Sequence, residues 1–358
     1  MEKSKFYSLI WNSTGKIFIV LLFAILGLVG ALKLLYSNYL FPDQGKTFQT
    51  IQSLDGNLRI EIDPDTLVIT PDLKIKEVTV KGKNLLFNLN PSLVVWTMLI
   101  IMMVTIASAS FPAFIWQIKH IIKFFELRLK HFLQAVILAL SIITFLSIYH
   151  YTMTGFYKPS DIIDNFGILF KNGNVINTVV ISTLLLQIPL LIVIFLVGIA
   201  AETITVDLSK KQSLEKAIIK FNMLNQLLTG ALQVLAILVV FSVLTTSALQ
   251  QSIKSALIIK SIDISPPELS YVYGLFFTLF LAIIYIPVQL FLRYRINSLK
   301  QDIQIQSQNE NEDNQQTYKN MIGQLNVGGT ALDNLKLAFT VLAPLISGFL
   351  PEQLKIFG

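Results

Sequence analysis

The chain contains no cysteine, few histidines and few charged residues, and each shortage excludes a kind of chemistry. Without cysteine, its 358 residues can form no disulfide, thiolate metal ligand or cysteine nucleophile. Its 3 histidines are scattered and lack clustered carboxylates, so we expect no metal site. Charged residues make up 14% of the chain, against about 25% in an ordinary soluble protein. Much of the protein surface is therefore expected to face lipid.

The motifs of common catalytic sites are missing as well. The chain has no H-E-x-x-H sequence, no Walker-type glycine loop and no Gly-x-Ser-x-Gly elbow. Apart from Lys33 near one end of the first span, no Asp, Glu, Lys or Arg lies inside an apolar stretch. Intramembrane chemistry and proton-coupled transport usually depend on such ionisable groups. We therefore expect a protein that is not an enzyme and that needs no cofactor.

Long apolar stretches are what the chain does have. A helix needs roughly 20 apolar residues to cross about 30 Å of hydrocarbon. Six stretches meet this condition: Ile17–Tyr36, Ser92–Trp116, Phe132–Tyr151, Ile176–Ala201, Thr229–Gln250 and Tyr271–Leu292. The predicted fold class is an all-α polytopic membrane protein, with six transmembrane helices arranged as three hairpins.

The positions of lysine and arginine predict an orientation. Basic residues are concentrated before the first span and after the second, fourth and sixth, whereas in the alternate loops they are balanced by acids. The positive-inside rule places the basic segments in the cytoplasm, together with both termini. We expect a multi-pass protein of the bacterial cytoplasmic membrane. The net charge of +6 then fits anionic lipid headgroups rather than nucleic acid.

The segments outside the spans divide the chain into five parts. Residues 1–36 are the N-terminal arm and first span, and residues 92–295 are the other five spans. Between them, residues 37–91 contain alternating stretches such as L-R-I-E-I-D, which predict an extracytoplasmic β-rich insert at about 45–90. Residues 296–330 are too polar to bury a core and predict a linker or frayed helix. Residues 331–358 predict a C-terminal amphipathic helix that lies on the membrane or docks on a partner, with a seventh span as the less favoured alternative.

A repeated basic sequence suggests an internal duplication. Residues 119–124 read K-H-I-I-K-F and residues 216–221 read K-A-I-I-K-F. Similar offsets relate a Leu-Gln pair and an Ile-Pro pair further along, so the repeated units are about 119–197 and 216–295. The arms, over residues 118–131 and 212–228, are predicted to be interfacial helices whose lysines face headgroups, namely Lys119, Lys123, Lys216 and Lys220. Helix kinks are predicted at Pro112, Pro189 and Pro287.

Uncharged polar side chains remain within the spans. The candidate polar path consists of four glutamines: Gln134, Gln187, Gln233 and Gln289. These side chains could line a path for a solute, since proline kinks free backbone carbonyls nearby. They could equally hydrogen-bond between helices, which is the commoner role of polar residues in membrane bundles.

The stretch S-L-E-K-A-I-I-K-F (213–221), followed by an apolar span that opens with Leu232-Gln233, resembles bacterial membrane-domain families. One of these is the membrane domain fused to glycerophosphodiester phosphodiesterases. The resemblance covers about residues 112–295 and implies basic arms leading membrane hairpins, without catalytic residues.

These features leave several functions open. The leading expectation is a channel-like or transport-associated subunit. An alternative is a membrane scaffold or anchor that recruits protein partners through the β-rich insert and the C-terminal helix, and another is a pore that depolarises the membrane. A homo-oligomer is compatible with each of them.

Overall fold

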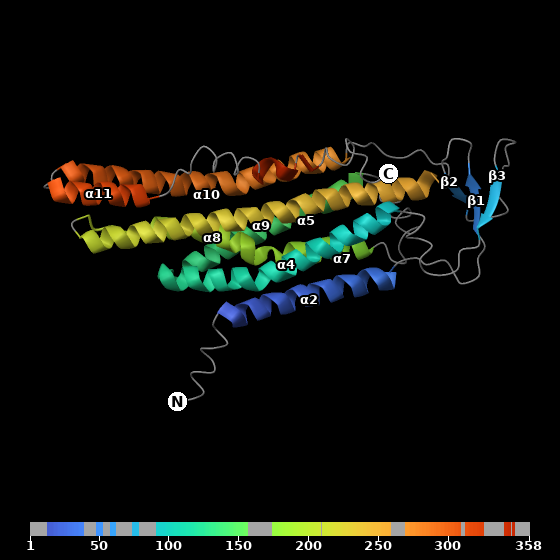
Figure 1. Ribbon diagram of the computed structural model, residues 1–358, viewed down its shortest axis with the longest axis horizontal. Helices are drawn as coiled ribbons and strands as arrows, with labels where there is room; N and C mark the ends of the chain where they lie inside the picture. The colour runs from blue at the N-terminus through green and yellow to red at the C-terminus, as the bar shows by residue number, and fades with distance from the viewer. Residues whose placement is uncertain are drawn as a thin grey trace, which may run out of the picture.

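The computed structural model is almost entirely helical and contains six helices that are long and apolar enough to cross a membrane (Figure 1). It describes residues 13–38, 48–52, 58–61, 74–78, 91–156, 174–208, 210–258, 269–308, 312–325, 340–344 and 346–347. Its candidate spans overlap all six predicted ones: Gly15–Ser37, Ser92–Phe124, Leu129–Ile148, Thr178–Thr203, Lys211–Ser252 and Gly274–Gln308. The prediction of a six-span, multi-pass membrane protein is therefore confirmed.

Each of the six apolar stretches lies within the helices of the bundle. These helices are α2 (Ser13–Asn38), α4 (Pro91–Phe124), α5 (Leu129–Phe156), α7 (Asn174–Leu186), α8 (Ile188–Thr203), α9 (Lys211–Ile258) and α10 (Leu269–Gln308). The fourth span is shared by α7 and α8, which are separated at Gln187. Pro189 explains this break, because it has no N–H to donate to the carbonyl four residues earlier.

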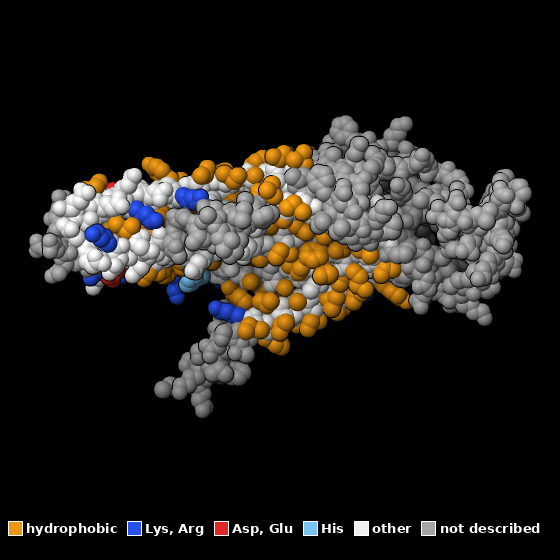
Figure 2. Space-filling model, turned by 45° about the horizontal axis from the view of Figure 1, so that its top comes forward, with side chains coloured by type: hydrophobic (Ala, Val, Ile, Leu, Met, Phe, Trp, Pro, Cys, Tyr) orange, Lys and Arg blue, Asp and Glu red, His pale blue; other side chains and the backbone are white. Residues whose placement is uncertain are grey.

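Helix α8 is the centre of the bundle. It packs against α4, α5, α9 and α10, and its buried residues are almost all aliphatic. Helix α2 lies at the periphery of the bundle, because it packs mainly on α4 and leaves most of its apolar side chains exposed. Space-filling Figure 2 shows apolar side chains over the middle of one face, with Lys and Arg gathered towards one end. This distribution is typical of a bundle surrounded by hydrocarbon.

Three short strands lie within the segment predicted to be β-rich. They are β1 (Phe48–Gln52), β2 (Leu58–Glu61) and β3 (Lys74–Val78), and they form an antiparallel sheet in the order β2-β1-β3. In the register of the sheet, Thr50 lies opposite both Ile60 and Lys76. The remaining residues of the insert lie outside the described part of the chain. These pairings alone do not establish the predicted insert as a folded β-rich unit.

The predicted arm helix over 118–131 is wrong, because α4 ends at Phe124 and α5 begins at Leu129. Glu126 adopts a left-handed conformation with φ 53°, and the Leu127 N–H donates to the Ile122 carbonyl at 3.0 Å. This six-to-one hydrogen bond after a left-handed residue is the Schellman arrangement that ends helices. Leu127 is buried behind the turn, which supplies the apolar contact that commonly accompanies it.

The polar stretch predicted as a linker or a frayed helix is helical over nearly all of its described residues. Helix α10 continues without a break through Gln308, and a further helix, α11 (Glu312–Gln324), follows it in the chain. Most of the C-terminal residues predicted to form an amphipathic helix lie outside the described part of the chain. Within it, residues 340–344 are helical.

Candidate functional site: the basic end and its projecting helices

Two helices extend well beyond the apolar part of the bundle. Helix α9 begins at Lys211, about five turns before the apolar run that opens at Thr229. Helix α10 continues from Arg293 to Gln308, more than four turns or about 24 Å beyond its last apolar run. Both extensions lie at the same end of the molecule, and α11 lies beside them (Figure 1). We call residues 211–228, 293–308 and 312–325 the stalk.

The three helices of the stalk pack around buried apolar side chains. Ile218 and Phe221 of α9, Ile303 of α10, and Met321 and Leu325 at the end of α11 are each no more than 4% exposed. All five belong to one buried cluster that continues into the centre of the bundle at α8. The stalk is therefore packed as a continuation of the membrane bundle.

A polar contact fixes the end of α11. The Asn222 side chain of α9 donates from Nδ2 to the Gln324 carbonyl at 2.8 Å. The last carbonyls of a helix have no partner within the helix, so a side-chain donor there stabilises the helix end. Asn222 and Gln324 are 102 residues apart in the chain. This hydrogen bond therefore adds a tertiary link to the apolar packing.

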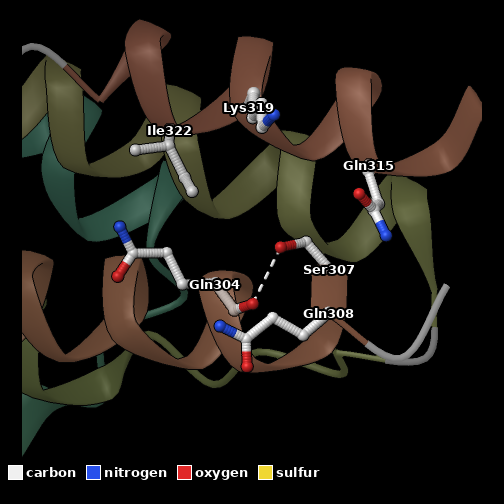
Figure 3. A pocket seen from close by; sticks show the side chains of 6 residues that line it. All are labelled: Gln304, Ser307, Gln308, Gln315, Lys319 and Ile322. Carbon is white, nitrogen blue, oxygen red and sulfur yellow. Dashed lines mark hydrogen bonds between the residues drawn. The ribbon is translucent and has the colours of Figure 1, made fainter. Parts of the chain in front are cut away.

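A shallow groove of about 640 Å³ lies between α10 and α11. Its lining is rich in amides and comes from both helices: Gln304, Ser307, Gln308, Gln315, Lys319 and Ile322 (Figure 3). The Ser307 hydroxyl donates to the Gln304 carbonyl of its own helix at 2.7 Å. Glutamine amides can both donate and accept hydrogen bonds, so the groove offers both kinds of group to a ligand.

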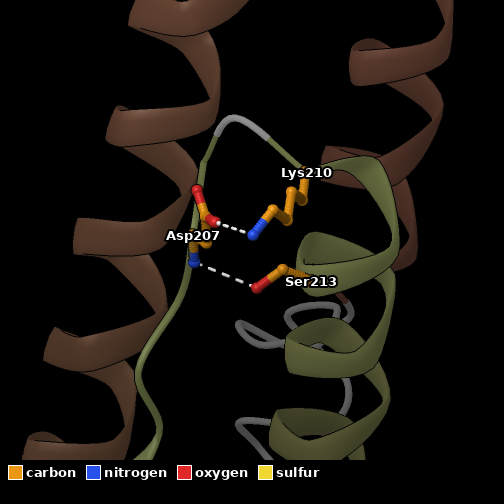
Figure 4. Close-up of polar contacts among 3 residues, drawn as sticks. All are labelled: Asp207, Lys210 and Ser213. Atoms are coloured by element: carbon orange, nitrogen blue, oxygen red, sulfur yellow. Dashed lines mark hydrogen bonds and ion pairs between the residues drawn. The ribbon is translucent and has the colours of Figure 1, made fainter.

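Polar contacts hold the turn between α8 and α9, at the base of the stalk. The Asp207 carboxylate pairs with Lys210 at 3.1 Å, and the Asp207 N–H donates to the Ser213 hydroxyl at 2.9 Å (Figure 4). Arg295 of α10 reaches across to the end of α8. It donates from Nε to the Ala201 carbonyl at 3.4 Å and from Nη2 to the Ile204 carbonyl at 3.1 Å. A cation at a helix C-terminus is favourable, so this contact ties α10 to α8 where the stalk begins.

The two K-x-I-I-K-F arms meet at this end of the bundle. Lys220 of α9 lies over the rings of Phe124 and Phe125, with its Nζ 5.9 and 5.6 Å from their centroids. His120 stacks on Phe124 with ring centroids 5.6 Å apart. The Lys220 ammonium group thus lies within cation–π range of two aromatic rings at the basic end of the bundle.

The predicted headgroup-facing lysines are at the surface, although their helices differ in context. Lys119, Lys123 and Lys216 are exposed, and Lys220 is partly buried by its aromatic contacts. The first arm forms the last turns of α4, whereas the second forms the first turns of α9. The internal duplication stays a prediction.

The structure separates the four glutamines of the candidate polar path. Gln187 and Gln289 are buried, whereas Gln134 and Gln233 are exposed on the outside of the bundle. A Cβ built on Gly198 of α8 would lie 3.6 Å from the Val288 side chain of α10, so these two residues are at the same height along the bundle. Gln187 immediately precedes α8 and is eleven residues before Gly198, which puts it about 16 Å along the helix axis from the height of Gln289.

Helix α8 offers no polar side chain to a path between Gln187 and Gly198. The α8 residues between Gln187 and Gly198 are nearly all buried and apolar. Gln289 accepts a hydrogen bond from Tyr285 of its own helix at 3.1 Å. The groove described above lies between α10 and α11, outside the membrane-spanning part of the bundle. The two buried glutamines are therefore isolated from each other.

The three prolines predicted to kink helices all lie within a helix or at its start. Pro112 is buried inside α4 and Pro287 is exposed inside α10, whereas Pro189 begins α8 after the break at Gln187. A helix break thus accompanies Pro189, and kinks at the other two prolines stay predictions. Among the residues that the structure describes, no three His, Asp or Glu side chains are grouped as metal ligands would be.

Comparison with protein-family models, curated proteins and solved structures gives no match. The resemblance of residues 112–295 to bacterial membrane-domain families therefore gains no support from these comparisons.

Proposed function

We propose that the protein is a membrane scaffold whose six spans hold the stalk at the membrane surface for a protein partner. The observation that carries this proposal is the apolar core shared by stalk and bundle. A helical unit fixed to the membrane in this way presents its outer surface in a constant orientation. Recruitment by a scaffold needs such a preorganised surface, because ordering a flexible tail on binding reduces affinity.

The chemistry of the groove favours a polypeptide as the partner. Five of its six lining residues are polar, and only Lys319 is charged. Side-chain amides match the donors and acceptors of a peptide backbone, whereas a phosphate or nucleic acid ligand is usually bound by several cations. Under the positive-inside rule, the charge of the basic end favours a cytoplasmic stalk, with the strands β1–β3 on the other side of the membrane. The exposed lysines of the arms would then contact anionic headgroups of a bacterial cytoplasmic membrane.

Photo-crosslinking from the stalk tests this function. We expect a photoreactive amino acid at Gln315, in the groove, to crosslink one discrete protein in native membranes. The same amino acid at Ile137, which is 62% exposed on α5 within the spans, should give lipid adducts only. The proposal is wrong if position 315 yields no protein adduct, or yields the same mixture of adducts as position 137.

A transport-associated subunit is the second candidate. The observation in its favour is Gln187, a buried polar residue at the break between α7 and α8. Discontinuous helices commonly form the binding sites of membrane transporters. Against it stand the apolar lining between Gln187 and Gln289 and their separation by about 16 Å along the bundle.

A further inference from the structure

The last described part of the chain, residues 340–344 and 346–347, packs against the bundle. Residues 340–344 are helical, and Val341 packs on the apolar cluster that forms the bundle core. Pro344 and Ser347 are buried, and the Ser347 hydroxyl donates to the Pro344 carbonyl at 2.8 Å. Val341, Pro344 and Ser347 follow one another at intervals of three, so one side of this segment faces the protein.

The opposite side of the segment is apolar too. Leu342 and Ile346 are each 43% exposed, close to the 45% of Leu140 and Ile286 on the spanning helices α5 and α10. Residues 337–350 include no charged side chain. A helix that lies on a membrane surface has a charged or strongly polar face towards water, and this stretch has none.

The position of the segment along the molecule agrees with its composition. In Figure 1, where the long axis is horizontal, the short dark red helix lies level with the part of α10 that crosses the membrane. Helix α11 lies at the stalk end of the same axis. The segment is thus placed with the spans and away from the stalk.

We infer that residues 340–347 are a membrane-embedded strap that binds the bundle with one side and lipid acyl chains with the other. The uncharged stretch 337–350 would be about 21 Å long as a helix, which is shorter than the roughly 30 Å of a hydrocarbon core. The strap is thus an additional embedded element rather than one more full-length span. It is also not a free C-terminal helix for recruiting partners, which leaves that role to the stalk.

Single cysteines test the strap directly, because the native chain has none to remove. Spin labels are attached at Leu342→Cys and Ile346→Cys in the full chain reconstituted into phospholipid vesicles. Collisions with oxygen, which concentrates in hydrocarbon, are compared with collisions with a water-soluble nickel chelate. Two controls are matched in exposure at 62%: Ile137→Cys on the membrane-spanning α5 and Ile305→Cys on the stalk.

We expect labels at 342 and 346 to behave like the label at 137, with frequent oxygen collisions and loss of nickel collisions. The inference is overturned if they behave like the label at 305. A membrane-impermeant maleimide gives an independent readout that needs no spin label. It should fail to label either cysteine in intact or permeabilised vesicles and should label both after denaturation in detergent, whereas labelling before denaturation contradicts the strap.

Discussion

Replacing Met321 by aspartate should release α11 from the stalk. Met321 is 4% exposed and belongs to the cluster shared by stalk and bundle. The substitution removes apolar packing and buries a carboxylate without a cation, which together cost about 4 kcal/mol or more. A 13-residue helix held by few contacts is not expected to stay docked against such a loss. Limited proteolysis of the purified protein should then cut at α11 much faster than in the native chain.

Asn320→Asp is the matched control for this prediction. It introduces the same side chain one residue earlier, on the exposed side of α11. The control should be cut at the native rate and should keep the protein crosslink from position 315, whereas Met321→Asp should lose both. Equal behaviour of the two variants would mean that α11 is not held by its apolar face.

Replacing Gly27 by leucine should separate α2 from α4. A Cβ at Gly27 would overlap the Ser108 hydroxyl and would lie 2.6 Å from the Ser108 Cβ. Overpacking at such a contact typically costs about 1–3 kcal/mol. Because α2 packs mainly on α4, this cost weakens the main interface that holds α2 in the bundle. The rings of Phe23 and Phe111 stack with centroids 6.2 Å apart. A bifunctional thiol reagent should therefore join cysteines placed at these two positions, and Gly27→Leu should abolish most of that crosslinking.

Gly30→Leu provides the comparison, because a Cβ at Gly30 meets nothing within 4 Å. The added side chain would enter lipid, and the Phe23→Cys/Phe111→Cys pair should crosslink as efficiently as before. If Gly27→Leu crosslinks as well as Gly30→Leu, the close approach of α2 and α4 is not what positions the first helix.

The six spans could be predicted from the sequence because length and apolar composition determine which segments cross a membrane. The end of α4 could not be predicted in the same way. Schellman turns usually have glycine at the left-handed position, and here that position is Glu126. The arm was therefore extended through residues that belong to the turn and to α5.

The stalk was missed for a related reason. Residues 300–320 are rich in glutamine and asparagine, and such polarity suggests a linker when the segment is considered alone. Few apolar residues hold this part of the stalk: Ile303 in α10, and Tyr318, Met321, Ile322 and Leu325 in and just after α11. The apolar positions of α11 follow helical spacing only over its last two turns, and their buried partners on α9 are about a hundred residues away in the chain. Tertiary packing decides the structure here, which no local window of sequence can show.

The polar path shows a different limit of sequence reasoning. Four glutamines within apolar spans suggested one lining, because sequence alone does not tell which side of a helix meets lipid. Packing around α8 buries Gln187 and Gln289 and leaves Gln134 and Gln233 outside. The direction in which each helix faces its neighbours was the missing information.

Solute flux across the membrane of proteoliposomes is the most direct test of the central claim. This claim is that the bundle supports the stalk and does not conduct ions or small solutes. Purified full-length protein is reconstituted, and the release of ions and small uncharged solutes is compared with that from empty vesicles. Gln187→Leu removes a buried amide, and Gln233→Leu makes the same change on the exposed surface. The scaffold account predicts no flux above that of empty vesicles for the native chain and for both variants. Flux through the native chain that Gln187→Leu abolishes and Gln233→Leu preserves would contradict it.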